Sequence, residues 1–192
     1  MQRSDYLVLV NKQNKLSENW EEKVELVEAK NGFGKIVKIE KETLEKFEEL
    51  RNSLLEENVD IELDSVYRSL PIQKDLYEEF KEKYWEEYAW NYAALPGFSE
   101  HHTWLALDIC IKKDGELISE NHEMIVELEI FDKIHRKLGD YWFILRYLDG
   151  KEKITWYTYE PRHLRYIWDV NIAKEIYEKW LTLEEYLGVV KS

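Results

Sequence analysis

The chain has a single cysteine, Cys110, among its 192 residues, so it cannot form an internal disulfide. This composition fits a reducing compartment without proving one. Cys110 is flanked by the apolar residues Ile109 and Ile111. We therefore predict that it is a small core residue and has no nucleophilic role.

Long apolar runs are also missing. No segment approaches the roughly 20 apolar residues that a membrane-spanning helix needs. The first residues, Met1 to Tyr6, lack the basic, apolar and small-residue series of a secretory leader. As written, the chain is therefore expected in the cytoplasm, whereas an incomplete N-terminus would allow a place in the cell envelope.

Basic residues are scarce relative to acidic ones. The chain has 27 Lys and Arg against 40 Asp and Glu, which gives a formal net charge of −13. Binding to nucleic acid depends on Lys and Arg neutralising phosphates. We therefore expect no nucleic-acid partner. The length suits one domain over residues 1–192, and the sequence leaves the oligomeric state open.

Hydrophobic spacing predicts an α+β domain, because helices and strands follow one another without regular alternation. We expect a small antiparallel sheet flanked by helices. Helices are predicted over about residues 41–57, 69–84, 121–138 and 172–181, and strands over about 61–65, 105–111 and 143–147. Asp114-Gly115 is typical of a hairpin turn. In the second helix, the predicted buried stripe is Ile72, Leu76, Phe80 and Tyr84.

Two segments together predict a metal site, Ser99 to Asp108 and Glu160 to His163. His101, Asp108 and His163 supply two imidazoles and one carboxylate, the ligand set of a catalytic zinc with an open position for water. Asp108 lies in an apolar strand, where an unpaired charge is costly to bury. Glu160 is a further carboxylate three residues before a ligand, placed to act as general base. Singly, each could be an ordinary loop or surface residue; together they favour a metal site.

The spacing resembles a known family. S-x-H-x-x-G-x-A-x-D followed by E-P-W-H is the signature of the VanY-type D-alanyl-D-alanine carboxypeptidases. The resemblance includes Ser65 to Ser69 with Gln73, where the family has S-G-Y-R-S followed by Q, and the strand-like run from Phe143 to Tyr147. It covers roughly residues 60–170, the expected catalytic core, while residues 1–40 carry less signal.

The resemblance implies a zinc enzyme that removes the terminal D-alanine from a peptidoglycan peptide or its precursor. Glu160 would accept a proton from the attacking water, and Arg68 would bind the substrate carboxylate or the developing oxyanion. Ser65, Gln73 and Ser99 would contact substrate or, equally well, satisfy turns. Three other histidines without a motif partner are predicted at the surface: His102, His122 and His135.

Other interpretations stay open. Within the enzyme class, L,D-cleavage of a tetrapeptide and cleavage of a free D,D-dipeptide use the same chemistry. Outside it, the chain could be a catalytically impaired zinc-binding protein that holds wall peptides, or a stable domain with a vestigial site. Two departures from the family bear on the substrate pocket: Val66 stands for glycine and Arg162 for tryptophan.

Tryptophan is common where relatives have glycine. Trp104, Trp142, Trp156 and Trp168 occupy such positions, and by resemblance Trp85 and Trp180 do so as well. The seven glycines are about half the average usage of ~7%, whereas tryptophan has eight copies. One hypothesis is a genetic code that reads a stop codon as glycine, written here as tryptophan. An indole at Trp104, between two ligands, is expected to displace the metal loop.

Overall fold

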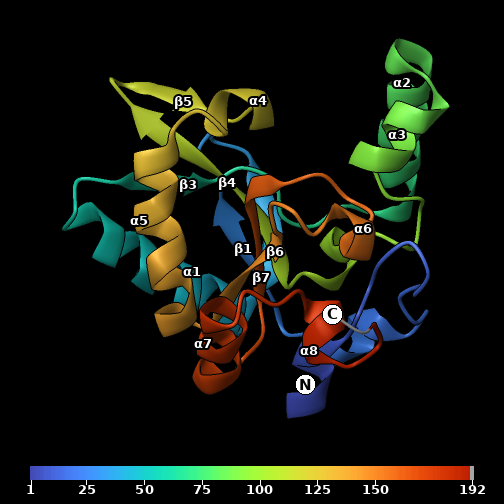
Figure 1. The fold of residues 1–192 in the computed structure, drawn as a ribbon, viewed down its shortest axis with the longest axis horizontal. Coiled ribbons are helices and arrows are strands. Elements are labelled where there is room, and N and C mark those ends of the chain that lie inside the picture. Colours follow the sequence, from blue (N-terminus) through green and yellow to red (C-terminus); the bar gives the residue numbers. More distant parts are fainter. Residues whose placement is uncertain (191–192) are drawn as a thin grey trace.

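A five-stranded antiparallel sheet forms the centre of the molecule (Figure 1). The computed structural model describes residues 1–190. The strands lie in the order β3 (Asp60–Leu63), β4 (Ala106–Lys113), β7 (Glu160–Tyr166) and β6 (Phe143–Tyr147). The short β5 (Glu116–Ile118) pairs with the far end of β4 through the expected turn at Asp114-Gly115. The prediction of a small antiparallel sheet in an α+β fold is therefore confirmed.

Three helices cover the sheet on one side: α1 (Lys41–Leu55), α5 (Leu128–Leu138) and α7 (Val170–Glu178) (Figure 1). They pack against one another and against the strands because each has an apolar face. The main core joins the faces of α1 and α5 to the inner strand residues, including Phe47, Phe131, Leu107 and Leu164. The apolar face of α7 packs in a second cluster with Ile144, Ile167 and Leu183. Cys110 is fully buried in the main core, as predicted.

The N-terminal part adds a separate hairpin of β1 (Leu26–Lys30) and β2 (Ile36–Glu40). Two short 3-10 helices precede it, η1 (Arg3–Leu7) and η2 (Trp20–Lys23). Tyr6 and Trp20, one from each helix, are buried in the same core cluster as Leu107. The segment with the weakest sequence signal thus contributes side chains to the main core.

Helices α2 (Leu70–Tyr84) and α3 (Glu86–Tyr92) pack on each other and stand away from the sheet (Figure 1). Ser69 caps α2 by accepting a hydrogen bond from the Ile72 amide. The predicted buried stripe of α2 is wrong: Ile72 is 56% exposed, and the other three members are half-buried. Gln73 and Tyr77 are the buried positions. Because α2 contacts α3 and not the core, its apolar stripe faces a groove.

Other predicted boundaries shift. Residues 121–138 form two helices, α4 (Asn121–Met124) and α5, with Val126 and Leu128 about 70% exposed at the break. The helix predicted over 172–181 ends at Glu178 and is followed by α8 (Leu183–Tyr186). Short helical turns also occur as η3 (Glu100–Thr103), η4 (Gly139–Tyr141) and α6 (Glu152–Thr155). Among the described residues, no helix combines the length and hydropathy required to cross a bilayer.

Candidate metal centre

Three elements bring His101, Asp108 and His163 together, and all three side chains are buried. His101 lies on η3, Asp108 on β4 and His163 inside β7. Asp108 and His163 are direct partners in the register of β4 and β7. The possible ligand atoms of the three residues lie within 4.8 Å of one another. The sequence-predicted triad therefore converges. The expectation that the Trp104 indole displaces the metal loop is wrong.

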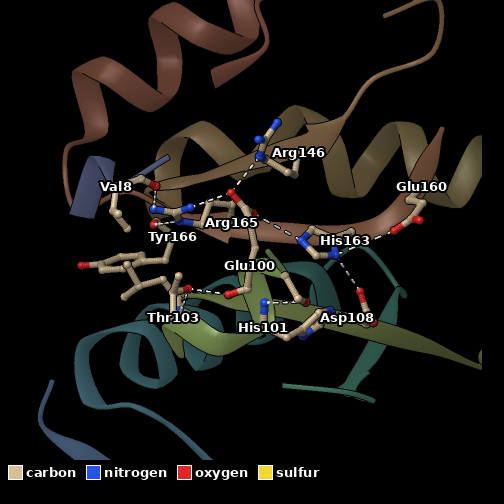
Figure 2. Close-up of polar contacts among 12 residues, drawn as sticks. Val8, Glu100, His101, Thr103, Asp108, Arg146, Glu160, His163, Arg165 and Tyr166 are labelled. Carbon is tan, nitrogen blue, oxygen red and sulfur yellow. Dashed lines mark hydrogen bonds and ion pairs between the residues drawn. The ribbon is translucent and has the colours of Figure 1, made fainter. Parts of the chain in front are cut away.

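The atoms of the triad point at a common space (Figure 2). Nε2 of His101 lies 3.3 Å from Oδ2 of Asp108, and Nδ1 of His163 lies 3.1 Å from Oδ1 of Asp108. Nε2 of His101 and Oδ1 of Asp108 are buried without a hydrogen-bond partner. Since buried polar atoms are normally partnered, these two atoms fit the role of metal ligands. Two imidazoles and one carboxylate suit zinc.

The electrostatics of the triad also fit a cation. Burial lowers the pKa of His101 to about 4, so its imidazole is neutral, as a ligand must be. The pKa of Asp108 lies well below its usual value; burial opposes this, but Arg162 and His101 outweigh it. Burial also opposes charge on His163, yet the neighbouring carboxylates of Asp108 and Glu100 raise its pKa to about 9. The surroundings therefore favour positive charge where a metal would bind.

Each histidine is oriented by a partner on its other ring nitrogen. Nδ1 of His101 contacts the backbone carbonyl of Val66. Nε2 of His163 lies 3.5 Å from Oε2 of Glu100. Such partners fix the ring orientation and the tautomer of metal-ligating histidines. The arrangement is thus already shaped for ligation by the nitrogens that face Asp108.

Glu100 belongs to a buried ion-pair cluster that the sequence analysis did not find (Figure 2). Its Oε1 accepts hydrogen bonds from Arg146 Nε at 2.8 Å and Arg165 Nη1 at 2.7 Å. Arg146 also makes a two-pronged contact with Glu184 on α8, at 2.7 and 2.9 Å. All four side chains are at most 1% exposed. The charged Arg146 within the apolar run of β6 was the available signal.

Glu160 begins β7 and lies beside the triad. Its Oε2 is 3.8 Å from Nδ1 of His163, and its side chain is 18% exposed. Burial raises its pKa, and the charge of Asp108 adds to this effect, although His163 opposes it. A carboxylate with a raised pKa is better suited to accept and return a proton.

Arg68 follows β3 and contacts Asp108 of the triad. Its Nη2 lies 3.4 Å from Oδ2 of Asp108, its Nη1 donates to Gln73 Oε1 at 3.2 Å, and its Nε donates to Ser65 Oγ at 3.3 Å. Gln73 is fully buried and donates to the Ala94 carbonyl. Two of the expected substrate contacts, Ser65 and Gln73, therefore hold the guanidinium of Arg68.

The remaining polar residues have structural contacts. Ser99 caps η3 by accepting the amide of His101. The surface prediction for His102 is wrong: it is buried, where its Nε2 accepts the Gly97 amide and its Nδ1 contacts the Arg68 carbonyl. His102 thereby supports the loop that carries Arg68. His122 is exposed as predicted, and His135 is half-buried against the Pro161 carbonyl.

A groove of about 490 Å³ opens onto the triad. One side is polar, with Ser65, Arg68, Asp108, Glu160 and Arg162. The other side carries the apolar stripe of α2 with aromatic residues of α3: Ile72, Leu76, Phe80, Tyr88 and Tyr92. Arg162 is anchored within the polar side, because it donates to Asp64 at 2.7 Å and to Asp108 at 3.3 Å. The groove therefore offers both polar and apolar contacts to a ligand beside the triad.

Two histidines and an aspartate around a metal position, with a carboxylate beside them and a groove above, define a zinc metallopeptidase. Comparisons with known proteins give the family. The family model for VanY, D-alanyl-D-alanine carboxypeptidase, matches residues 36–169. The chain belongs to the VanY family of carboxypeptidases.

Two curated relatives have the same level of identity. The protein named "Putative carboxypeptidase YodJ" of Bacillus subtilis is 36% identical over 192 residues, which cover 97% of this chain and 68% of YodJ. VanXYC of Enterococcus gallinarum, named as a bifunctional D-Ala-D-Ala dipeptidase and carboxypeptidase, is 36% identical over 129 residues, which cover 66% of each protein. The chain thus spans about two thirds of the length of these relatives.

Solved structures agree in fold. The D,D-pentapeptidase VanY from a VanB-type resistance cassette, solved with Zn(II), matches with a TM-score of 0.79 and 29% identity. The match covers 95% of this chain and 99% of the VanY chain. The LD-carboxypeptidase LdcB has a TM-score of 0.82 and 33% identity, and covers 98% of this chain and 88% of its own. Zinc is thus the metal found in a VanY relative of the same fold.

Proposed function

We propose that the chain is a zinc-dependent D-alanyl-D-alanine carboxypeptidase that removes the terminal D-alanine from bacterial cell-wall peptides. The observation that carries this proposal is the convergence of His101, Asp108 and His163 beside Glu160 and Arg68 at the base of one groove. Zinc bound there would act as a Lewis acid and make water nucleophilic at neutral pH. We propose residues 60–170 as the part of a single domain that supplies these groups.

Glu160 is the proton carrier in this proposal. Its carboxylate borders both the groove and the metal position, 3.8 Å from a ligand nitrogen, without belonging to the triad. It takes a proton from the attacking water and passes it to the leaving amine of the released residue. Its raised pKa supports the first transfer, because it narrows the pKa gap between the carboxyl group of Glu160 and the donor water.

Arg68 is the anion-binding group in this proposal. A carboxypeptidase must recognise a terminal carboxylate, and the planar guanidinium can bind it with two hydrogen bonds. Ser65 and Gln73 hold the guanidinium at the edge of the groove, so little side-chain freedom is lost when substrate binds.

L,D-cleavage of a tetrapeptide is the second candidate, since LdcB matches this fold with a higher TM-score and higher identity than VanY does. Two assays separate D,D-cleavage from L,D-cleavage. They measure D-alanine release by the zinc-loaded chain from a muramyl pentapeptide and from the matching tetrapeptide. We expect faster release from the pentapeptide. Faster release from the tetrapeptide would assign the second activity, and no release from either would contradict both.

Glu160→Gln tests the mechanism. The variant should bind one zinc ion, yet release D-alanine at least about 100-fold more slowly, the usual size of a general-base contribution. Glu45→Gln on the exposed face of α1 makes the same chemical change at a residue outside the groove lining and should match the parent. Parent-like turnover in Glu160→Gln would remove Glu160 from the mechanism.

A further inference from the structure

Six of the eight tryptophans have a backbone that favours glycine. Within residues 1–190, eight residues other than glycine have positive φ, and six of them are tryptophans with φ between 51° and 105°: Trp85, Trp104, Trp142, Trp156, Trp168 and Trp180. The other two are Asn58 and Asp114, residue types that tolerate this region. Only a few per cent of non-glycine residues have positive φ, so chance does not account for this set.

Most of these tryptophans stand directly after a helix, a position that glycine often occupies in proteins. Trp104, Trp142 and Trp156 follow η3, η4 and α6 in the left-handed conformation, and Trp180 follows the last turn of α7. Glycine is favoured there because it has no Cβ to crowd the preceding carbonyl. Trp85 separates α2 from α3 with φ 105° and ψ 165°, a region that is essentially restricted to glycine.

The contacts of the indoles support the same interpretation. Trp104 is 4% exposed, and its Nε1 is buried without a hydrogen-bond partner. Trp85 and Trp180 are 65% and 43% exposed, unusual for so large an apolar side chain. By contrast, Trp20 is absent from the positive-φ set, is 3% exposed, and donates its Nε1 to the Thr103 carbonyl at 3.0 Å. Trp20 has the environment of a true tryptophan.

The composition agrees. Replacing the six tryptophans by glycine would raise glycine from seven copies to about the average of ~7%. It would leave tryptophan only at Trp20 and at Trp90, which lies within α3. In the standard code UGG alone encodes tryptophan, and UGA is a stop codon. A sequence written with UGA as tryptophan would show tryptophan wherever a cell reads UGA as glycine.

We infer that residues 85, 104, 142, 156, 168 and 180 are glycine in the protein that the source cell makes, encoded by UGA and decoded by a glycine-charged tRNA. Glycine at position 104 removes the indole whose ring centroid lies 4.3 Å from that of Tyr67. Both rings line a cavity of about 270 Å³ beside the metal loop. Positions 156 and 168 flank the segment with Glu160 and His163. The backbone that holds the ligands then has its left-handed turns without side-chain strain.

Peptide mass spectrometry of the protein isolated from its source cells tests this inference. Each peptide that contains one of the six positions should carry the glycine mass, and the peptides with Trp20 and Trp90 should carry the tryptophan mass. The gene should show UGA at the six codons and UGG at the other two. Tryptophan mass at the six positions, or UGG in their codons, would overturn the inference.

Two recombinant chains provide an independent test that does not depend on activity. A chain with glycine at all six positions should unfold at a higher urea concentration than the chain as printed, and should bind one zinc ion. Trp20→Gly in the six-glycine chain is the matched control, and it should unfold at a lower concentration because Trp20 is a core residue. A printed chain that unfolds at a higher concentration than its six-glycine counterpart would contradict the inference.

Discussion

Removing the charge of Glu100 tests how much the buried cluster contributes to the metal centre. Glu100→Gln keeps the shape of the side chain but removes the carboxylate that pairs with Arg165. Within residues 1–190, the other hydrogen bonds of Arg165 go to the carbonyls of Tyr6, Val8 and Tyr166. Arg146 keeps its two-pronged pair with Glu184, so the loss falls mainly on one arginine.

The expected cost follows from this geometry. Breaking a buried ion pair by removing one partner costs about 3–5 kcal/mol, and we expect the lower end because Arg146 stays paired. His163 also loses the carboxylate 3.5 Å from its Nε2, which should weaken zinc binding by about 10- to 100-fold. Glu100 therefore contributes to both stability and ligand orientation.

Urea unfolding and competition with a chromogenic zinc chelator measure the two effects separately. Glu175→Gln is the control, because Glu175 pairs with Lys179 on the exposed face of α7 and should contribute less than about 0.5 kcal/mol. If Glu100→Gln unfolded within about 0.5 kcal/mol of the parent and bound zinc equally well, the role assigned to the cluster would be refuted.

Three further predictions concern the core, the thiol and the groove. Leu164→Ala, at a fully buried position between β4 and β6, should lower the free energy of unfolding by about 2–5 kcal/mol in urea, and a loss below about 1 kcal/mol would contradict its core role. Burial raises the pKa of Cys110 from 9.0 to about 12, so the thiol loses its proton at a lower pH in the unfolded chain than in the folded one. The difference in the free energy of unfolding between the parent and Cys110→Ala should therefore be constant below pH 9 and shrink above it. A difference that stays constant from pH 8 to 11 would contradict this. Arg68→Lys keeps the charge but loses the two-pronged geometry, so kcat/KM for peptide hydrolysis should fall about 10- to 100-fold with zinc content unchanged. This fall corresponds to a loss of about 1.4–2.7 kcal/mol in transition-state binding. Parent-like kinetics would remove Arg68 from substrate binding.

Local patterns were sufficient where neighbours in the sequence decide the conformation. The periodicity of residues 41–57 predicted α1, the apolar run 143–147 predicted β6, and Asp114-Gly115 predicted a hairpin turn. The same holds for the triad, because metal chemistry restricts which side chains can serve and an apolar strand leaves Asp108 few other partners.

Packing between distant segments decided what local patterns missed. The stripe of α2 is apolar whether it faces a core or a groove, so only the position of α2 beside α3 shows that Ile72 is exposed. His102 is buried because the Arg68 loop folds over it, a contact between residues 34 apart in sequence. Separate segments likewise meet to form the ion-pair cluster of Glu100, Arg146, Arg165 and Glu184.

The sequence by itself indicated the ligand types and the α+β class, because these depend on residue chemistry and short-range spacing, and the family resemblance indicated four glycine positions occupied by tryptophan. Only the tertiary structure showed that His163 lies within β7 opposite Asp108 and that Glu100 lies beside the ring of His163. It also showed which tryptophans have positive φ. Backbone angles and the burial of charge depend on contacts between distant segments, and these contacts exist only in the folded chain.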